Sequence, residues 1–494
     1  LNQNMQLTLM STFNASQANE ARLGYNRTHV NTNANSMGQD WNNMYGIPNG
    51  NLGDSITKGI FEASLPPTSN FGTPDWVAFI VSNAMAVTDN FTWVKGKHTL
   101  KLGINLNHIE DTSADTIGGD DPRGALTFDP AMTSFDGVAP PFAYPAFLLG
   151  TMTSSARARF VNGWPYQTYW QNAFYAQDDF KILPSLTLNI GFRYEITTRP
   201  IERYNRQSNW DTRTNEIALA TKDDRSPSLN LDKGDVGPRV GLAWSPDHGK
   251  TSIRAGFGIS YWQAYWSGPL TILGLGYPNY AKQQLLSSNN LTPDLLLSRD
   301  GLPLASAEYD SSGNLVIPAN AVIRGTNFNW KSQQVAQTSV NVQREVAHGV
   351  LVDIGYLSVR GLHNNHTTNI NQAPPQPPGA NYNLARPLAG QYPQLGDIPV
   401  QFSNTASWYD ALTARVVAQP GHGITLSASY AHARNFSNGN NIDPANLYQY
   451  YGPTQQDIAH TVTAEFSYEL PVGHGKQFLP NANRVVDAIL GGWQ

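Results

Sequence analysis

The chain has 494 residues, more than one compact core usually needs, and a length that ordinarily indicates several domains. Charged residues make up only 14% and the formal net charge is −5, so the composition gives no reason to expect a nucleic-acid partner. There is no cysteine, which excludes disulfides, thiolate metal ligands and cysteine nucleophiles, and no apolar run is long enough for a membrane-spanning helix.

The first predicted element is a β-hairpin over residues 5–29. In its second strand, Ala21, Leu23 and Tyr25 alternate with polar or small residues. A period of two is typical of a strand, because successive side chains point to opposite faces of a sheet. Comparable patterns follow along the chain at 85–107, 169–199, 239–261, 333–360, 406–435 and 457–470.

The hairpin at 169–199 has the clearest pattern, and its second strand is long compared with the five or six residues usual in soluble proteins. One face of that strand is apolar and consists of Leu186, Leu188, Ile190, Phe192 and Tyr194. The other is small or polar and consists of Thr187, Asn189, Gly191, Arg193 and Glu195.

The spacing of the strands predicts the architecture. Turns within a hairpin are short, whereas long loops are expected at about 30–82, 111–166, 200–235, 263–332, 361–405 and 436–456. Soluble domains rarely carry so many long loops, but outer-membrane barrels have short periplasmic turns, long extracellular loops and strands that alternate apolar and polar residues. The predicted fold class is therefore all-β, an antiparallel transmembrane β-barrel with about 13 to 14 strands present in residues 1–494. Soluble β-sandwich or propeller domains are the alternative.

Several segments resemble the barrel of TonB-dependent outer-membrane transporters, specifically the Oar-like group. They lie in family order along almost the whole chain, at 19–27, 91–103, 175–180, 186–195, 237–244 and 490–493. Each motif alone is weak, and their joint order carries the resemblance. It implies a bacterial outer-membrane location, a barrel of 22 strands, an N-terminal regulatory-like β-domain after a signal peptide, and a plug domain inside the barrel.

The implied function is active transport of a large or scarce substrate, energised by the TonB–ExbB–ExbD complex. The expected partners are the lipid bilayer, the plug domain of the same chain, that complex and an unknown transported ligand. We expect the sequence to be a fragment lacking the signal peptide, the regulatory-like domain, the plug, the TonB box and the last strands. The alternative function is a surface-exposed adhesion or glycan-binding β protein without transport.

Two sets of residues are candidates for binding. The charged residues expected to face the lumen and a plug are Arg22, Lys101, Arg193, Glu195, Arg239 and Arg254. The loop aromatics expected to contact substrate are Trp41, Tyr45, Tyr448, Tyr450 and Tyr451. Aromatic residues next to strand ends are instead expected in the girdle at the lipid headgroups, and these include Trp164, Tyr166 and Trp262.

Catalysis finds little support in the sequence. Asp178 and Asp179 are adjacent on a strand, so they point to opposite faces and cannot act as an acid/base pair. The pair Asp120 and Asp121 in a glycine-rich loop favours a solvated acidic turn over a Ca²⁺ site. His363 and His366 lie in a predicted loop without a nearby carboxylate. The sequence therefore predicts no enzyme activity, no cofactor and no metal site.

Overall fold

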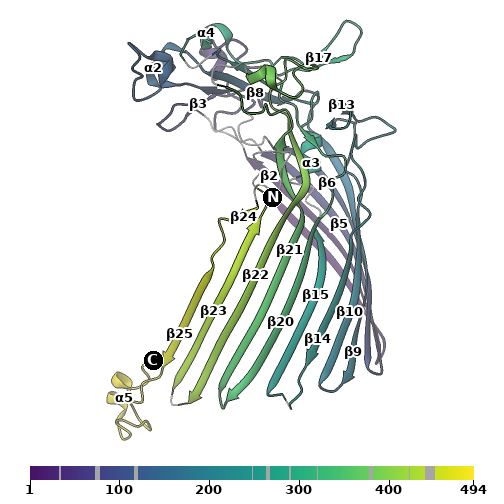
Figure 1. The fold of residues 1–494 in the computed structure, drawn as a ribbon, viewed down its shortest axis with the longest axis vertical. Helices are drawn as coiled ribbons and strands as arrows, with labels where there is room; N and C mark the ends of the chain where they lie inside the picture. The colour runs from purple at the N-terminus through teal and green to yellow at the C-terminus, as the bar shows by residue number, and fades with distance from the viewer. Residues whose placement is uncertain are drawn as a thin grey trace.

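The structure is a computed structural model that describes residues 1–32, 35–72, 78–115, 121–247, 249–262, 268–288, 291–319, 321–377, 382–421, 423–439 and 451–494. In that part of the chain, thirteen long strands form one antiparallel sheet in which strands consecutive along the chain are neighbours (Figure 1). They are β1 (Asn2–Asn14), β2 (Gln17–Thr32), β5 (Ala78–Lys95), β6 (His98–Asp115), β9 (Tyr166–Leu183), β10 (Leu186–Thr197), β14 (Val236–Trp244), β15 (Thr251–Trp262), β20 (Gln333–Ala347), β21 (Val350–Asn369), β22 (Pro399–Gly421), β23 (Ile424–Ser437) and β25 (His460–Tyr468).

This arrangement confirms the predicted all-β antiparallel class and the strand number. The sheet is open within the described residues, because β1 pairs only with β2 and β25 pairs only with β23. Three short strands extend its edges or ends: β11 (Ile201–Glu202), β19 (Gly325–Thr326) and β24 (Gly452–Pro453). The helix α5 (Arg484–Leu490) follows β25.

The sheet has two chemically different faces. Side chains opposite each other on neighbouring strands share a face, and one such row runs through Arg22, Thr88, Asn105, Ala173 and Glu195. We call this side the polar face. The opposite side, the apolar face, includes Ile190 and Phe192, which are each 52% exposed. Exposed apolar residues on every long strand require an apolar medium around the sheet.

Turns and loops lie at opposite ends of the sheet (Figure 1). Two residues separate β1 from β2, β5 from β6, β9 from β10 and β20 from β21. Between β5 and β6, Gly96 has a φ of 60°, as a tight hairpin turn requires. The asymmetry between short turns and long loops is therefore present in the structure.

The loops contain more regular structure than their sequence predicts. One five-stranded sheet has the order β16 (Tyr280–Leu286), β8 (Ser154–Phe160), β7 (Ala125–Thr127), β3 (Glu62–Ser64) and β4 (Phe71–Gly72). Two small hairpins are β12 (Ser208–Asp211) with β13 (Glu216–Leu219) and β17 (Glu308–Tyr309) with β18 (Leu315–Val316). The helices are α1 (Trp41–Met44), η1 (Pro130–Thr133), α2 (Tyr144–Leu149), α3 (Pro269–Gly274), α4 (Leu297–Asp300) and η2 (Tyr382–Ala385). We call these loop elements together the loop layer.

The hydrophobic core lies mainly in this loop layer. One cluster of buried residues is built around Leu126, Phe128 and Leu302, and a second around Trp210, Ile323 and Ile398. The expectation for the loop at 361–405 was wrong at both ends. Strand β21 continues to Asn369 and β22 begins at Pro399, so both strands extend further toward the loop layer than the sequence predicts.

Candidate functional site

The outermost part of the loop layer contains an apolar cavity of about 510 Å³. It lies between α1, α2, α4 and the small strands β3 and β4. Its apolar lining consists of Tyr45, Ile47, Ile60, Phe61, Phe71, Phe147, Leu148, Leu149 and Leu297. A cavity lined by so many large apolar side chains is suited to apolar or aromatic groups of a ligand.

Local sequence fixes the wall formed by α2. Proline lies in the first turn of this helix, and Gly150 ends it in the left-handed conformation with a φ of 69°. Phe147 packs against the ring of Phe71 with 5.6 Å between ring centroids. Leu148 and Leu149 are 81% and 69% exposed, so the helix presents two leucines to solvent at the cavity.

Trp41 and Tyr45, two of the predicted loop aromatics, lie at this cavity. Tyr45 is part of its lining, and Trp41 stacks on Tyr45 with ring planes 20° apart. The structure does not bring Tyr451 to the same surface, because its ring packs against Trp408 and Phe436 on the apolar face. Tyr448 and Tyr450 lie outside the described residues.

The residues around α2 were missed by the sequence analysis. The segment 145–150 has no strand period, although proline at its start and glycine at its end are signals for a short helix. The leucines of this helix, more than the aromatics, form the exposed wall of the cavity.

Buried polar groups hold the loops under the cavity together. The fully buried Arg157 donates hydrogen bonds to the backbone carbonyls of Asn49 (2.7 Å), Gly50 (3.1 Å) and Pro303 (3.3 Å). Burial lowers the pKa of this guanidinium to about 10, and the nearby carboxylate of Asp121 opposes that shift. Three loop segments are thereby joined through one side chain.

The expectation of a solvated acidic turn was wrong for Asp121. Its carboxylate is buried and lies 3.1 Å from the buried guanidinium of Arg123. A buried charge is tolerated in a protein interior where an opposite charge pairs with it. The other member of the predicted pair, Asp120, lies outside the described residues.

The charged residues expected in the lumen all fall on the polar face. Lys101 pairs with Asp179 at 2.8 Å, and Asn189 and Gln177 also donate to that carboxylate. The Nε of Arg193 lies 2.6 Å from Glu195, and its Nη1 donates to Asn105. Much of this charge is therefore neutralised within the wall.

The remaining predicted lumen residues differ in their surroundings. Arg22 pairs with Glu20 on the same strand. Arg239 lies opposite Gly191 and Gly258, and Arg254 lies opposite Ala243 and Asn341. Neither Arg239 nor Arg254 forms an ion pair with any residue that the structure describes. These two arginines are accessible to another part of the protein or to a ligand.

Loop residues also cover part of the polar face near its loop end. Leu270 and Leu273 of α3, together with Leu229 and Trp330, pack on Tyr169 of β9. Ile109 of β6 borders the same cluster. The loop layer therefore extends over the polar face of β6 and β9 as well as beyond the sheet.

The candidate catalytic and metal residues do not converge. Asp178 pairs with His98 at 2.7 Å on the apolar face, whereas Asp179 lies on the polar face. His366 is within β21, not in a loop, and stacks on Phe402. In the described ranges there is no group of three or more His, Cys, Asp or Glu side chains that could hold a metal ion.

No helix among the described residues is both long and apolar enough to cross a membrane. A continuous meander of long antiparallel strands, with one apolar and one polar face and with turns and loops at opposite ends, instead defines the wall of an outer-membrane β-barrel. The family model of the outer membrane beta barrel domain matches residues 1–494, so the chain belongs to that family and is located in the outer membrane.

Solved structures with a similar strand arrangement include three outer-membrane transporters or receptors. The outer membrane transporter YddB from Escherichia coli is 8% identical with a TM-score of 0.47, and the match covers 88% of this chain and 42% of YddB. The copper transporter OprC is 10% identical with a TM-score of 0.46, and the match covers 89% of this chain and 47% of OprC. The pyoverdine receptor FpvA from Pseudomonas aeruginosa PAO1 is 11% identical with a TM-score of 0.45, and the match covers 95% of this chain and 48% of FpvA.

The chain thus spans less than half the length of these three structures. The comparison with curated proteins finds no match.

Proposed function

We propose that this chain forms the wall and outer loops of a TonB-dependent transporter of the Oar-like group. The exposed apolar cavity beside α2 carries the proposal, because it gives an outer-membrane barrel a surface for capturing ligand. The sequence motifs of the Oar-like group support the same assignment. Energy then comes from TonB–ExbB–ExbD, through a plug domain of the same protein.

In this mechanism the loop layer binds first. Apolar or aromatic groups of the ligand contact Leu148, Leu149 and Tyr45, and Trp41 stacks on the Tyr45 ring. Burying one leucine-sized group contributes about 1.5–3 kcal/mol, so two such contacts strengthen binding by a factor of roughly 10²–10⁴ over a ligand that lacks these groups.

The polar face is then the path of the ligand and the seat of the plug. Its wall is lined by small and polar side chains, and ion pairs such as that of Lys101 with Asp179 leave few unpaired charges to retain a passing solute. Arg239 and Arg254 are two of the cations available to pair with acidic residues of a plug. The protein is a transporter in this proposal, and no catalytic step is required.

The test uses the full-length protein in its own outer membrane. Membrane fractionation and heat-modified gel mobility first establish a folded barrel. Whole cells with and without TonB are then compared for ligand-dependent growth and for retention of ligand at the surface. Transport requires TonB, whereas surface retention does not, so TonB-independent function would support the adhesion alternative and refute transport.

A loop substitution tests the cavity itself. Leu148→Asp places a charge in the apolar wall, and we expect at least about tenfold weaker capture, since about 1.4 kcal/mol corresponds to a factor of ten. Leu384→Asp is the matched control, because Leu384 is 75% exposed in η2 and lines no part of the cavity. Equal capture by both variants would refute a role for the cavity.

A further inference from the structure

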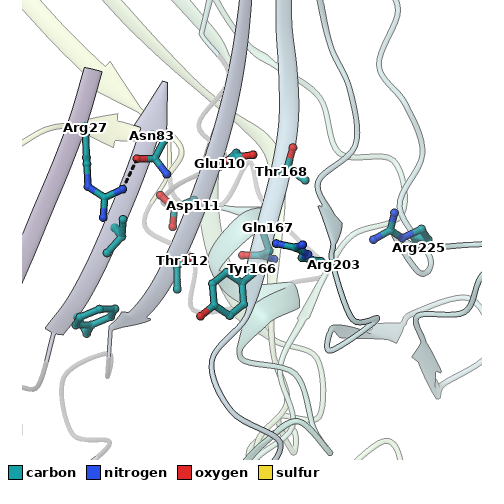
Figure 2. A pocket seen from close by; sticks show the side chains of 12 residues that line it. Arg27, Asn83, Glu110, Asp111, Thr112, Tyr166, Gln167, Thr168, Arg203 and Arg225 are labelled. Carbon is teal, nitrogen blue, oxygen red and sulfur yellow. Dashed lines mark hydrogen bonds between the residues drawn. The ribbon is translucent and has the colours of Figure 1, made fainter. Parts of the chain in front are cut away.

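A second cavity, of about 670 Å³, lies where β2, β5, β6 and β9 meet the loop layer (Figure 2). Three arginines line it, Arg27 from β2 and Arg203 and Arg225 from the connection after β10. Figure 2 shows Arg27 on the β2 side and Arg203 and Arg225 on the β9 side, with Tyr166 and Thr112 between them.

Strand register places most of the strand residues that line this cavity on the apolar face of the sheet, while Asp111 and Gln167 of its lining belong to the polar face. Arg27 lies opposite Asn83, Asn83 opposite Glu110, and Glu110 opposite Thr168. Because Arg27 is four residues from Leu23 on an unbroken strand, both side chains are on the same face. Arg203 follows β11 and bonds through its backbone to Tyr166, which shares this face with Thr168. The row of polar residues therefore faces the surrounding membrane, not the lumen.

Aromatic residues give the level of this row relative to the lipid. Tyr25 and Trp170 lie one step closer to the turns than Arg27 and Thr168, on the same face. The rings of Phe79 and Trp164 pack together at 4.4 Å at the loop end. Aromatic belts of this kind mark the headgroup region of the bilayer. Tyr166 lies in this belt as expected. Trp262 instead belongs to the polar face, because it is an even number of residues from Arg254 on the same strand.

The three guanidinium groups have no anionic partner in the described part of the chain. Arg27 donates to the amide oxygen of Asn83 at 3.1 Å. Arg225 donates to Asn205 at 3.3 Å and to the Glu202 carbonyl, and Arg203 lies 5.8 Å from the centre of the Tyr204 ring. Other arginines on the apolar face are paired, since Arg360 lies 2.8 Å from Asp410 and Arg434 lies 3.5 Å from Asp457. On the apolar face, unpaired arginines are thus concentrated at this cavity, and the carboxylates of Glu110 and Asp111 also line it.

We propose that the cavity binds the phosphate group of an outer-leaflet lipid headgroup. Guanidinium groups bind phosphate oxygens through paired charge-assisted hydrogen bonds. A cavity that opens on the membrane-facing side, just beyond the aromatic belt, is reached by a headgroup whose acyl chains lie along the apolar face below it. The side-chain amide of Asn83 provides a further donor in the same row. The bound lipid would tie the loops carrying Arg203 and Arg225 to the bilayer.

The test uses the full-length protein refolded in phosphatidylcholine vesicles, with and without phosphatidic acid as the phosphomonoester lipid. Lipid retained after mild detergent extraction is counted by native mass spectrometry. We expect Arg203→Gln to reduce the retained phosphatidic acid about tenfold, and Arg27→Gln with Arg203→Gln to abolish it. Arg203→Lys should recover part of the retention, because it keeps the charge but loses the two-pronged geometry.

Arg434→Gln is the matched control, since Arg434 is an exposed arginine on the apolar face outside the cavity. An equal loss in this control would mean that only net charge matters, and it would overturn the proposal. Unchanged retention in the Arg27 and Arg203 double variant would overturn it as well. A third arm titrates inorganic phosphate against the phosphatidic acid. If soluble phosphate displaces the lipid at millimolar concentration, the site binds a soluble phosphate and the assignment to a lipid headgroup is wrong.

Discussion

Replacing the buried Arg157 with methionine should separate the loop segments that this side chain joins within the loop layer. Methionine fills a similar volume but cannot donate, so the carbonyls of Asn49 and Pro303 lose this donor, and the Gly50 carbonyl keeps only the side-chain amide of Asn42. A buried polar group left without a hydrogen bond costs about 1–3 kcal/mol. Some of the three carbonyls will relax toward water, and we therefore expect the loop layer to lose about 3–5 kcal/mol of stability.

Limited proteolysis of the protein in outer-membrane vesicles, over a urea gradient, measures this loss. In Arg157→Met the loops should be cut at lower urea, while heat-modified gel mobility of the barrel stays unchanged, because the wall strands keep their own hydrogen bonds. Arg299→Met is the control, since the side chain of Arg299 is 59% exposed and pairs only at the surface. The reasoning would be refuted if the two variants were cut at the same urea concentration, or if Arg157→Met destabilised loops and barrel together.

Three further expectations concern other parts of the chain. Hydrogen bonds from Arg213 lower the pKa of Asp211 to about 2 in the loop layer, so this carboxylate stabilises the fold above about pH 4 and the stabilisation is lost as the pH falls through 2. Tryptophan fluorescence, which includes the buried Trp210 beside it, should show a shallower acid transition in Asp211→Asn, and an unchanged transition would contradict this. Gly103→Ala would place a Cβ 2.3 Å from the ring of Tyr175 and break the hydrogen bond from Tyr175 to Asn90. We expect the unfolding free energy in liposomes to fall by about 1–3 kcal/mol. Gly24→Ala is the control and should be nearly neutral, because the nearest atom to its new Cβ is 3.8 Å away. Lys101→Gln should cost no more than about 1 kcal/mol in the same unfolding assay, because the Lys101 side chain is 42% exposed, and a larger loss would indicate that this ion pair holds the wall together.

The wall of the barrel was predictable because each strand has its own periodic signal. Leu186 to Tyr194 alternate without interruption in the sequence. The structure keeps that register along β14, and along β9 from Thr187 onward, with one shift between Leu186 and Thr187. The periodic signal is absent where both faces of a strand are polar. In β21 the residues Asn364 to Thr367 face no lipid on either side, so no alternation indicates that the strand continues.

The loop layer could not be derived in the same way. Leu126 packs with Phe61 and Leu302, residues far apart in the sequence, and none of their segments has a helical or strand period long enough to recognise. Non-local pairing of two- and three-residue strands leaves no local signal. Of the candidate site, sequence therefore predicted Trp41 and Tyr45 from residue type alone, and missed the helix that completes the cavity around them.

The strand order in the five-stranded sheet of the loop layer limits how the ligand-capturing surface can be changed. Strand β7 pairs with β3 on one side and β8 on the other, and β8 pairs in turn with β16. These strands come from three different connections of the barrel, so each connection supplies the hydrogen-bond partners of the next. Exchanging the connection that carries β7 and β8 would leave backbone amides unpaired in both of the others, and exchanging either outer connection would leave them unpaired in this middle one. A chimera with altered ligand preference therefore has to exchange all three connections as a set, and natural variation in one of them has to be accompanied by compatible changes in the others.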